Sequence, residues 1–293
     1  MYFQTFTEQY KSVFEDYLTR LVQEQSQTDV EAAMNYSLKA GGKRLRPLLL
    51  IALVKAFKKN DKEAFPVAAA LEMIHTYSLI HDDLPAMDDD DLRRGKPANH
   101  IKFSEATAIL AGDALLTKAF EILAEAKYSD KAKISLIKEL AFASGHEGMI
   151  GGQQADMDGE KQELSIEQLS AIHYRKTGRL IIFAFRSAGI LSDLNEEMKI
   201  TLDKIAEKIG IAYQIRDDIL DVSSSEEELG KRVGSDLKQG KSTYPSLLGI
   251  DSAKRLLKEH LNEALRLNKE IKNHVESYDE ELLATFIASI KLK

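Results

Sequence analysis

The placement of proline constrains the fold of this chain more than any other feature of its sequence. All five prolines lie outside residues 98–244, at Pro47, Pro66, Pro85, Pro97 and Pro245. The proline-free stretch is rich in Ala, Leu, Ile, Glu and Lys, which suits helices joined by Gly and polar breaks. We find no β-branched and aromatic residues alternating between glycine-rich turns, the usual sign of hairpins. The sequence therefore predicts an all-α protein.

Apolar residues at helical spacing indicate the individual helices. The segment 66–84 is apolar nearly all round and has Pro66 in its first turn, so we expect it at the centre of a bundle. Further helices are expected at 4–24, 29–40, 47–57, 104–127, 131–149, 165–189, 195–222 and 243–258, and in the C-terminal segment. Because the breaks between them are short, we expect one domain over residues 1–293, a bundle of about ten helices.

Composition excludes several classes of protein. The net charge of −7, from 40 Lys+Arg and 47 Asp+Glu, argues against a dedicated nucleic-acid binder. The absence of Cys excludes disulfides, thiolate zinc sites, iron–sulfur clusters and cysteine catalysis. The longest apolar run, 48–54, is far shorter than the roughly 20 residues that span a bilayer, so no stable membrane insertion is expected. The N-terminus lacks a secretory pattern, and we expect a cytoplasmic protein.

The first unusual motif is a cluster of aspartates directly after the apolar helix. Six aspartates lie within residues 82–91. Runs of this kind are most often solvated loops, but Asp82 and Asp83 continue the apolar helix, where unpaired carboxylates are unfavourable unless they bind cations. Pro85 cannot continue the helix, so the chain should break there and return Asp88 toward Asp82.

A second carboxylate cluster occupies residues 217–221. Asp217 and Asp221 stand one helical turn apart and share a face, a pattern that alone is common on surface helices. Two such clusters without Cys favour Mg²⁺ or Ca²⁺ over zinc, and neither has the spacing of a Ca²⁺ loop. Mg²⁺ keeps room in its coordination shell for substrate phosphates. Together the clusters predict a polyphosphate ligand that is bridged to the protein through metal.

Cationic residues accompany both clusters. Lys43, Arg44 and Arg46 lie on a glycine-flanked turn that opens a helix, a favourable place for an anion. Other candidates follow along the chain at Arg93, Arg94, Lys96, Lys176, Lys231 and Lys241. Each of them could instead be solvated or form surface salt bridges of little energetic value. Two groups of cations and two of carboxylates suggest a site for two phosphorylated substrates.

These motifs resemble those of the trans-isoprenyl diphosphate synthases, most closely the bacterial farnesyl diphosphate synthases. The resemblance covers nearly the whole chain. It is carried in order by GGKRLRP (41–47), LIHDDLPAMDDDDLRRGKP (79–97), GMIGGQQADMD (148–158), YRKTGRLI (174–181), YQIRDDILD (213–221) and GKRVGSDLKQGKSTYP (230–245). It implies the isoprenoid synthase fold, in which the helices surround a central cavity.

The resemblance also implies an activity and roles for single residues. The reaction would be the condensation of isopentenyl diphosphate with dimethylallyl or geranyl diphosphate through an allylic carbocation, with about three Mg²⁺ ions. The implied metal ligands are Asp82, Asp88 and Asp217, with Asp83 and Asp221 in support. The implied ligands of the allylic diphosphate are Arg93, Lys176, Thr177, Gln214 and Lys231, of which Lys176, Thr177 and Gln214 would also be catalytic. Isopentenyl diphosphate would be bound by Lys43, Arg46, His75 and Arg94. His75 could otherwise be an ordinary core histidine.

Two further positions bear on the product. Tyr77 lies five residues before Asp82, roughly 7.5 Å along a helix, where an aromatic ring would block a growing chain. In the family, an aromatic residue there together with Pro85 and Ala86 is typical of C15 synthases, although Tyr77 could simply be core. Arg179 departs from the family, which more often has a small residue there, and we expect a surface substitution.

Several alternatives remain at this stage. The product could be C20, which would make the chain a geranylgeranyl diphosphate synthase. A terpene cyclase shares a helical fold and an aspartate motif, but it would not need the cations on the isopentenyl side. A non-catalytic prenyl synthase subunit would be expected to lose an aspartate motif, and both are complete here. A purely structural bundle is the fourth possibility. The family implies a homodimer, for which helices near 104–149 could supply the interface.

Overall fold

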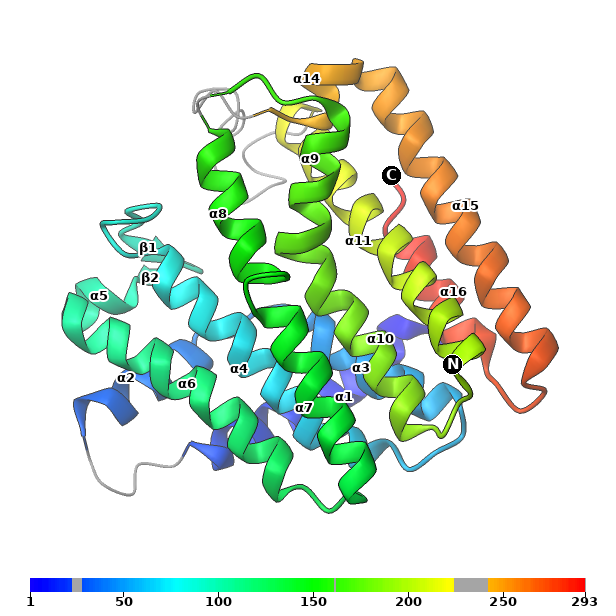
Figure 1. The fold of residues 1–293 in the computed structure, drawn as a ribbon, viewed down its shortest axis with the longest axis horizontal. Helices are drawn as coiled ribbons and strands as arrows, with labels where there is room; N and C mark the ends of the chain where they lie inside the picture. Colours follow the sequence, from blue (N-terminus) through cyan, green and yellow to red (C-terminus); the bar gives the residue numbers. More distant parts are fainter. Residues whose placement is uncertain (23–27, 161, 224–241, 293) are drawn as a thin grey trace.

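The computed structural model describes residues 1–22, 28–160, 162–223 and 242–292. Within these ranges, 12 α-helices are eight residues or longer, and α5 and α14 are shorter (Figure 1). The prediction of an all-α protein is confirmed. None of the helices in the described ranges is long and apolar enough to cross a membrane.

The helices follow one another through most of the chain. The first half contains α1 (Phe3–Leu21), α2 (Asp29–Leu38), α3 (Leu45–Ala56), the short 3₁₀ turn η1 (Asp61–Ala64), α4 (Phe65–Asp82), α5 (Asn99–Lys102), α6 (Glu105–Glu125) and α7 (Asp130–Ser144). The second half contains α8 (Met149–Gly159), α9 (Ile166–His173), the π-turn η2 (Tyr174–Gly178), α10 (Arg179–Leu191), α11 (Glu196–Ser223), α14 (Tyr244–Leu248), α15 (Ile250–His274) and α16 (Glu280–Ser289).

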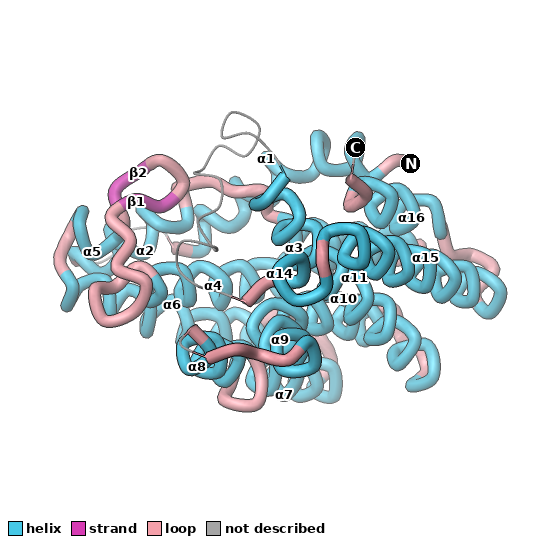
Figure 2. Tube along the Cα trace, turned by 90° about the horizontal axis from the view of Figure 1, so that it is seen from above, coloured by secondary structure: helices cyan, strands magenta, loops and turns pink. Residues whose placement is uncertain are grey.

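Helix α4 lies at the centre of the bundle, as its apolar sequence predicts. Most of its residues are buried on every side, and it packs against α6, α3 and α10 (Figure 2). Small residues in the facing helix, among them Ala108, Ala111 and Gly112 of α6, are also buried and allow a close approach. The centre of the molecule therefore consists of one helix whose C-terminal end carries the first aspartate cluster.

Three predicted helices are interrupted in the structure. The π-turn η2 separates α9 from α10 within the predicted helix 165–189. The predicted helix 243–258 is broken at Gly249, whose φ of +78° favours glycine, and its second part, α15, continues to His274. Helix α8 follows α7 after a break of a few residues that the predicted helix 131–149 does not contain.

A small hairpin corrects the expectation that the chain has no strands. The two-residue strands β1 (Leu92–Arg93) and β2 (Lys96–Pro97) pair in antiparallel fashion. The turn between them places Arg94 and Gly95 at φ +55° and +75°, as a two-residue hairpin loop requires. Tyr36 Oη of α2 donates a hydrogen bond to Pro97 O at 2.8 Å, which ties the hairpin to the bundle.

Candidate active site

The end of helix α4 brings part of the first aspartate cluster together. The helix ends at Asp82, and the chain then turns through Pro85. The backbone N–H of Asp88 donates a hydrogen bond to the carbonyl of Asp82 at 2.9 Å. The predicted return of Asp88 toward Asp82 is therefore confirmed for the backbone.

The Asp82 carboxylate lies in an environment that disfavours its negative charge. Burial raises its pKa to about 6; Lys176 and Arg93 oppose this shift, whereas Asp88 and Asp83 reinforce it. Among the residues that the structure describes, none forms a hydrogen bond or ion pair with this carboxylate. A largely buried carboxylate beside another negative charge is stabilised by a cation. The carboxylate oxygens of Asp82 and Asp88 are therefore suitable ligands for a metal ion.

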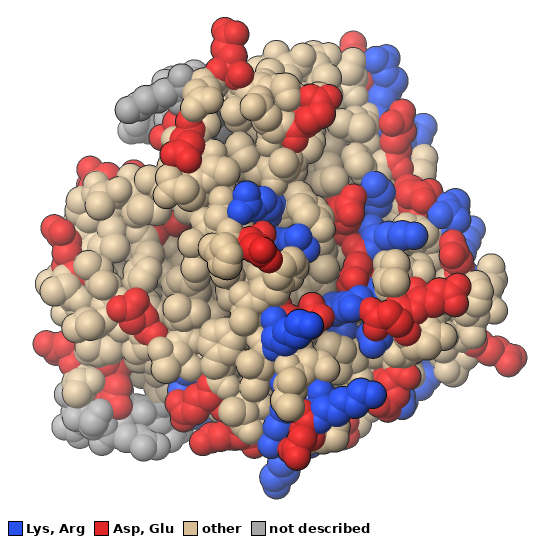
Figure 3. Space-filling model, in the orientation of Figure 1, with Lys and Arg blue, Asp and Glu red and all other residues tan. Residues whose placement is uncertain are grey.

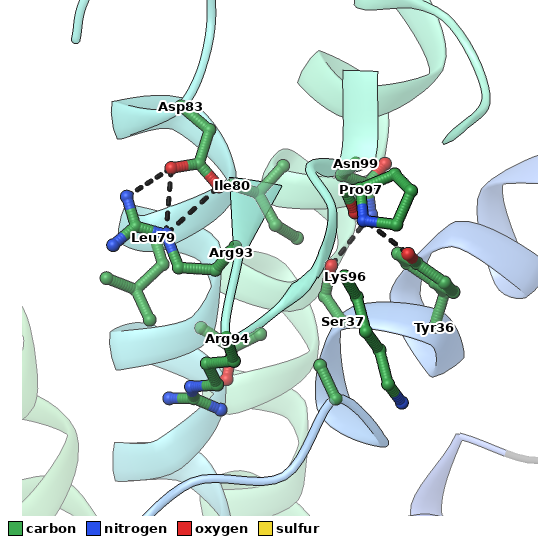
Figure 4. A pocket seen from close by; sticks show the side chains of 12 residues that line it. Tyr36, Ser37, Leu79, Ile80, Asp83, Arg93, Arg94, Lys96, Pro97 and Asn99 are labelled. Carbon is green, nitrogen blue, oxygen red and sulfur yellow. Dashed lines mark hydrogen bonds and ion pairs between the residues drawn. The ribbon is translucent and has the colours of Figure 1, made fainter. Parts of the chain in front are cut away.

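Asp83 differs from Asp82 because its carboxylate forms an ion pair with Arg93. It is 2% exposed, and Nε of Arg93 donates to its Oδ1 at 2.9 Å and to its Oδ2 at 3.2 Å (Figure 4). Arg93 also pairs with Asp90 at 3.3 Å. The guanidinium of Arg93 lines a small pocket beside the hairpin, and neither of the two large cavities described below is lined by it. Asp83 thus positions Arg93.

An apolar cavity of about 640 Å³ extends from the end of α4 between α6, α8 and η2. Its lining includes Asp82, Lys176 and Thr177 together with mostly apolar side chains such as Leu84, Met87, Ile109, Leu116, Met149, Ile150, Met157 and Leu180. Tyr77 also lines it and is 5% exposed. The phenol has no hydrogen-bond partner in the described part of the chain, and burial raises its pKa to about 12.

A polar cavity of about 650 Å³ adjoins the apolar one, because Arg46, His75 and Thr177 line both. It brings together the four residues that we expect to bind isopentenyl diphosphate, with two from the second half of the chain: Lys43, Arg46, His75, Arg94, Gln214 and Asp217. These residues come from four separate segments of the sequence. The fold therefore places a cation-rich cavity directly beside an apolar one.

The cations of the polar cavity act on one another. Arg46 Nη1 lies 3.5 Å from His75 Nε2. Burial, and then the positive charges of Arg46 and Arg94, hold the pKa of His75 well below its usual range, so its imidazole is neutral. Burial also lowers the pKa of Arg46, whose Nε has no hydrogen-bond partner within the described ranges. An anion in this cavity would relieve both effects.

The glycine-flanked turn before α3 separates a structural arginine from the binding candidates. Arg44 is 4% exposed and pairs with Glu72 at 2.6 Å and with Glu15 at 3.2 Å. Gly42 has a φ of +132°, and a Cβ there would lie 2.7 Å from Cζ of Arg94. Glycine at this position therefore lets the hairpin arginine reach the turn, where its Nη1 donates to the carbonyl of Gly41.

The π-turn η2 presents Lys176 and Thr177 to the cavities. A Cβ at Gly152 of α8 would lie 2.2 Å from the backbone N of Lys176, so the absence of a side chain allows the close contact between α8 and η2. Lys176 Nζ donates to Asp156 Oδ2 of α8 at 2.6 Å. Sequence reasoning did not single out Asp156, although it lies in the motif at 148–158. π-Turns inside helices are frequent at functional sites.

The second aspartate cluster also divides its doublet between two roles. Asp217 lines the polar cavity, and Gln214 lines it from nearly one turn earlier in α11. Asp218 is buried, and its Oδ2 accepts a hydrogen bond from the backbone N–H of Tyr244 at 2.9 Å. Asp221 is 2% exposed. Lys231 and Lys241, which we also singled out, lie outside the described residues.

The carboxylates do not form a complete metal site by themselves. In the described ranges, no three His, Asp or Glu side chains gather closely enough to hold a metal ion. Mg²⁺ commonly binds through one or two carboxylates plus substrate phosphates. The carboxylates of Asp82, Asp88 and Asp217 fit that mode of binding.

Arg179 is not the plain surface substitution that we expected. Its guanidinium carbon lies 4.5 Å from the ring centroid of Phe142 and 4.7 Å from that of Tyr174. Stacking between two rings stabilises a cation of this kind. Arg179 therefore joins the start of α10 to α7, and it lines neither of the two cavities.

Comparisons with known proteins agree with this geometry. The sequence profile described as polyprenyl synthetase matches residues 27–282. The chain is 54% identical over 241 residues to a farnesyl diphosphate synthase of Bacillus subtilis (strain 168), which covers 81% of each chain. It is 41% identical over 282 residues to a geranylgeranyl diphosphate synthase of Cyanophora paradoxa, which covers 95% of this chain and 92% of that one.

A solved structure has the same fold. It is a Helicobacter pylori geranyltransferase complexed with magnesium and isoprenyl diphosphate, and it matches with a TM-score of 0.84 and 35% identity over 97% of this chain and 96% of that one. The resemblance in the six sequence motifs is confirmed, and the chain belongs to the polyprenyl synthetase family.

Proposed function

We propose that the protein is a farnesyl diphosphate synthase, which condenses isopentenyl diphosphate with dimethylallyl and then geranyl diphosphate. One observation carries the proposal: a cation-rich cavity and an apolar cavity meet at Arg46, His75 and Thr177. A site for this reaction needs both. The polar cavity would bind isopentenyl diphosphate, and the apolar cavity would hold the hydrocarbon chain of the allylic substrate as it grows.

The proposed reaction breaks one bond and forms another. The C–O bond of the allylic diphosphate breaks, and the diphosphate leaves with the electron pair. The resulting allylic cation bonds to the terminal alkene carbon of isopentenyl diphosphate, and the released diphosphate takes up the proton that is then lost. Bound Mg²⁺, held by Asp82, Asp88 and Asp217, would supply positive charge that stabilises the leaving diphosphate.

The protein's own groups bind and orient the substrates. Lys43, Arg46 and Arg94 offer positive charge to isopentenyl diphosphate in the polar cavity, and the neutral His75 offers a hydrogen-bond donor. Lys176, which pairs with Asp156 in this structure, would pair with the allylic diphosphate when that substrate is bound. The remaining proposed ligands of that diphosphate are Arg93, Thr177, Gln214 and Lys231. Thr177 and Gln214 line the polar cavity, where their dipoles can face an allylic cation without consuming it.

The apolar cavity would protect the cation and set the product length. Largely apolar walls exclude water, which would otherwise quench a carbocation. Tyr77 supports the C15 assignment because its buried ring lines this cavity, one turn and a half before Asp82 along α4. The relatives include a C20 synthase, so a geranylgeranyl product is the second candidate.

The proposal includes a homodimer that works in the cytoplasm as a single-domain enzyme. The homodimer is supported by exposed apolar side chains on α5 to α7 that line neither cavity: Ile101, Leu110, Ile134 and Phe142. In Figure 3 the charged side chains are sparser over the left of the view, where α5 and α6 lie, than over the right, where α15 lies. A second copy of the chain would remove this surface from water.

Product analysis tests the proposal. The purified protein is incubated with isopentenyl and dimethylallyl diphosphates and Mg²⁺, with EDTA in a control, and the chain length of the products is determined. We expect a metal-dependent C15 diphosphate. A C20 or longer product would keep the mechanism and refute Tyr77 as the floor of the cavity. No condensation would favour a cyclase or a non-catalytic subunit.

A further inference from the structure

His81 occupies a slot between two helices beside the apolar cavity. It lies in the last turn of α4, and Gly112 lies opposite in α6. A Cβ built on Gly112 would come within 2.1 Å of Nε2 of His81 and within 2.8 Å of Cε1, so the imidazole fills the space that a side chain on Gly112 would need. The same Nε2 lies 3.1 Å from the carbonyl of Ile109, which holds the ring in this slot.

The anchored imidazole contacts Tyr77. The two residues are four apart in α4 and therefore share a face, and side chains of a helix lean toward its N-terminus, so His81 leans toward Tyr77. Their ring centroids are 5.8 Å apart with an interplanar angle of 76°, an edge-to-face arrangement. Both rings line the apolar cavity.

Tyr77 needs such a neighbour because no polar contact fixes its ring. Its hydroxyl is buried and has no hydrogen-bond partner in the described part of the protein. The orientation of the ring therefore depends on packing, and His81 is the aromatic neighbour within its own helix. In contrast, His81 is itself fixed from α6 through Ile109 and Gly112.

We infer that His81 is a specificity-determining residue: seated in the slot left by Gly112, it holds the Tyr77 ring across the floor of the apolar cavity and so limits product length. The inference rests on the proposed synthase function. It gives α6 a role in the control of chain length, which the position of Tyr77 in the sequence does not indicate.

Three variants of the full-length protein test this role: His81→Ala, Gly112→Ala and the double variant. His146→Ala, which removes an exposed imidazole that does not line the cavity, is the matched control. Each protein is given dimethylallyl and isopentenyl diphosphates with Mg²⁺, and the ratio of C20 to C15 product is measured. A separate assay with geranyl diphosphate measures kcat and KM for the C15 step, and circular dichroism checks folding.

Loss of the imidazole, or its displacement by a methyl group on Gly112, should let the Tyr77 ring move. We expect each single variant to raise the C20 to C15 ratio about tenfold, the range typical of small changes in an apolar pocket, while kcat for the C15 step stays within about threefold of the wild type. The double variant should equal His81→Ala, because the added methyl group then has no imidazole to displace.

The outcomes separate this inference from the proposed function. If the wild type makes C15 and both single variants make only C15 at normal rates, the inference is wrong and the synthase proposal stands. Should one single variant fail to fold, the product ratio of the other decides. A wild type that makes no prenyl product refutes the proposed function, and with it the inference that depends on it.

Discussion

Two charged regions of the molecule differ in how their charges are satisfied. At the far end of α10, Arg186 pairs with Asp203 at 2.8 Å, with Glu196 at 2.5 Å and with Glu139 at 3.6 Å, which joins α7, α10 and α11. At the end of α4, Asp82 has no such partner among the described residues, and Nε of Arg46 has none either. Burial raises the pKa of one aspartate to about 6 in each region, but Asp203 has Arg186 as an ion-pair partner, whereas Asp82 has none among the described residues.

A related difference, in which one member lines a cavity and the other is bound within the scaffold, divides each aspartate doublet. Asp83 is bound to Arg93 and Asp218 to the backbone N–H of Tyr244, whereas Asp82 and Asp217 line the two cavities. Adjacent residues of a helix point about 100° apart, so one doublet can serve both the scaffold and the site. Residue type alone therefore does not separate the carboxylates that line the cavities from those that are bound within the scaffold.

The largest effect should come from Asp82→Asn. We expect kcat in saturating Mg²⁺ to fall by about 10³-fold or more, because the charge that would hold a metal beside the leaving diphosphate is lost. The melting temperature should stay equal or rise, because burial and Asp88 both disfavour the native charge. Steady-state kinetics and thermal unfolding measure the two effects. Normal activity in this variant would contradict the assignment of Asp82, rather than the Arg186 network, to ligand binding.

Arg186→Met should have the opposite pattern. Removing the centre of a partly buried ion network leaves three carboxylates without their shared cation, so the free energy of unfolding should fall by about 2–3 kcal/mol. We expect kcat to stay within about threefold, since Arg186 lies in the second half of α10 and lines neither cavity. Urea unfolding gives the stability. A loss of kcat without a loss of stability would contradict the assignment.

Asp83→Ala should give an intermediate result with both effects. The variant loses a buried carboxylate and frees the half-exposed Arg93, so stability should fall by about 1–2 kcal/mol. Because Arg93 is then no longer positioned, kcat/KM for the allylic substrate should fall about tenfold. An unchanged kcat/KM would show that the ion pair serves the scaffold alone. Asp218→Ala is the matched control. Its free energy of unfolding should fall by about 1 kcal/mol, because the hydrogen bond from the Tyr244 backbone N–H is lost, but Arg93 should stay in place.

The smallest effect concerns pH. Burial raises the pKa of Asp203 from its ordinary 3.8 to about 6, against the lowering effect of Arg186. A raised folded-state pKa means that the protonated carboxyl favours the native state, so its contribution is complete below about pH 4 and is lost as the pH rises through 6. Partial exposure limits the loss to about 1 kcal/mol. In Asp203→Asn this decline should be missing from unfolding curves between pH 4 and 7; an identical decline would assign it to other groups.

Local rules predicted much of this architecture. The apolar sequence of α4 predicts its central position, and Pro85 predicts the return of Asp88, because both depend on neighbouring residues. The π-turn η2 and the pair between Lys176 and Asp156 were missed, since each depends on the contact between two helices at Gly152. The hairpin was missed for a related reason: its strands have two residues each and no periodicity to detect.

The resemblance to the family distinguished Asp82 from Asp83 and Asp217 from Asp218, but the partners that Asp83 and Asp218 bind were beyond sequence reasoning. Asp82 and Asp83 are chemically identical side chains, and it is their surroundings that distinguish them: Asp82 lines the apolar cavity, whereas Asp83 pairs with Arg93. The slot at Gly112 belongs to the same class, because a glycine within a helix does not show by itself what fills its space. Such contacts are fixed by packing between elements rather than by local pattern.

The central claim is that Asp82, whose carboxylate has no hydrogen-bond or ion-pair partner among the described residues, binds a diphosphate through a metal ion, and calorimetric titration tests this most directly. Inorganic diphosphate is titrated into the wild type, Asp82→Asn and Arg186→Met, with and without Mg²⁺. We expect binding to the wild type and to Arg186→Met only when Mg²⁺ is present, and at least tenfold weaker binding to Asp82→Asn. Equal binding by all three proteins, or binding that ignores Mg²⁺, would contradict the claim.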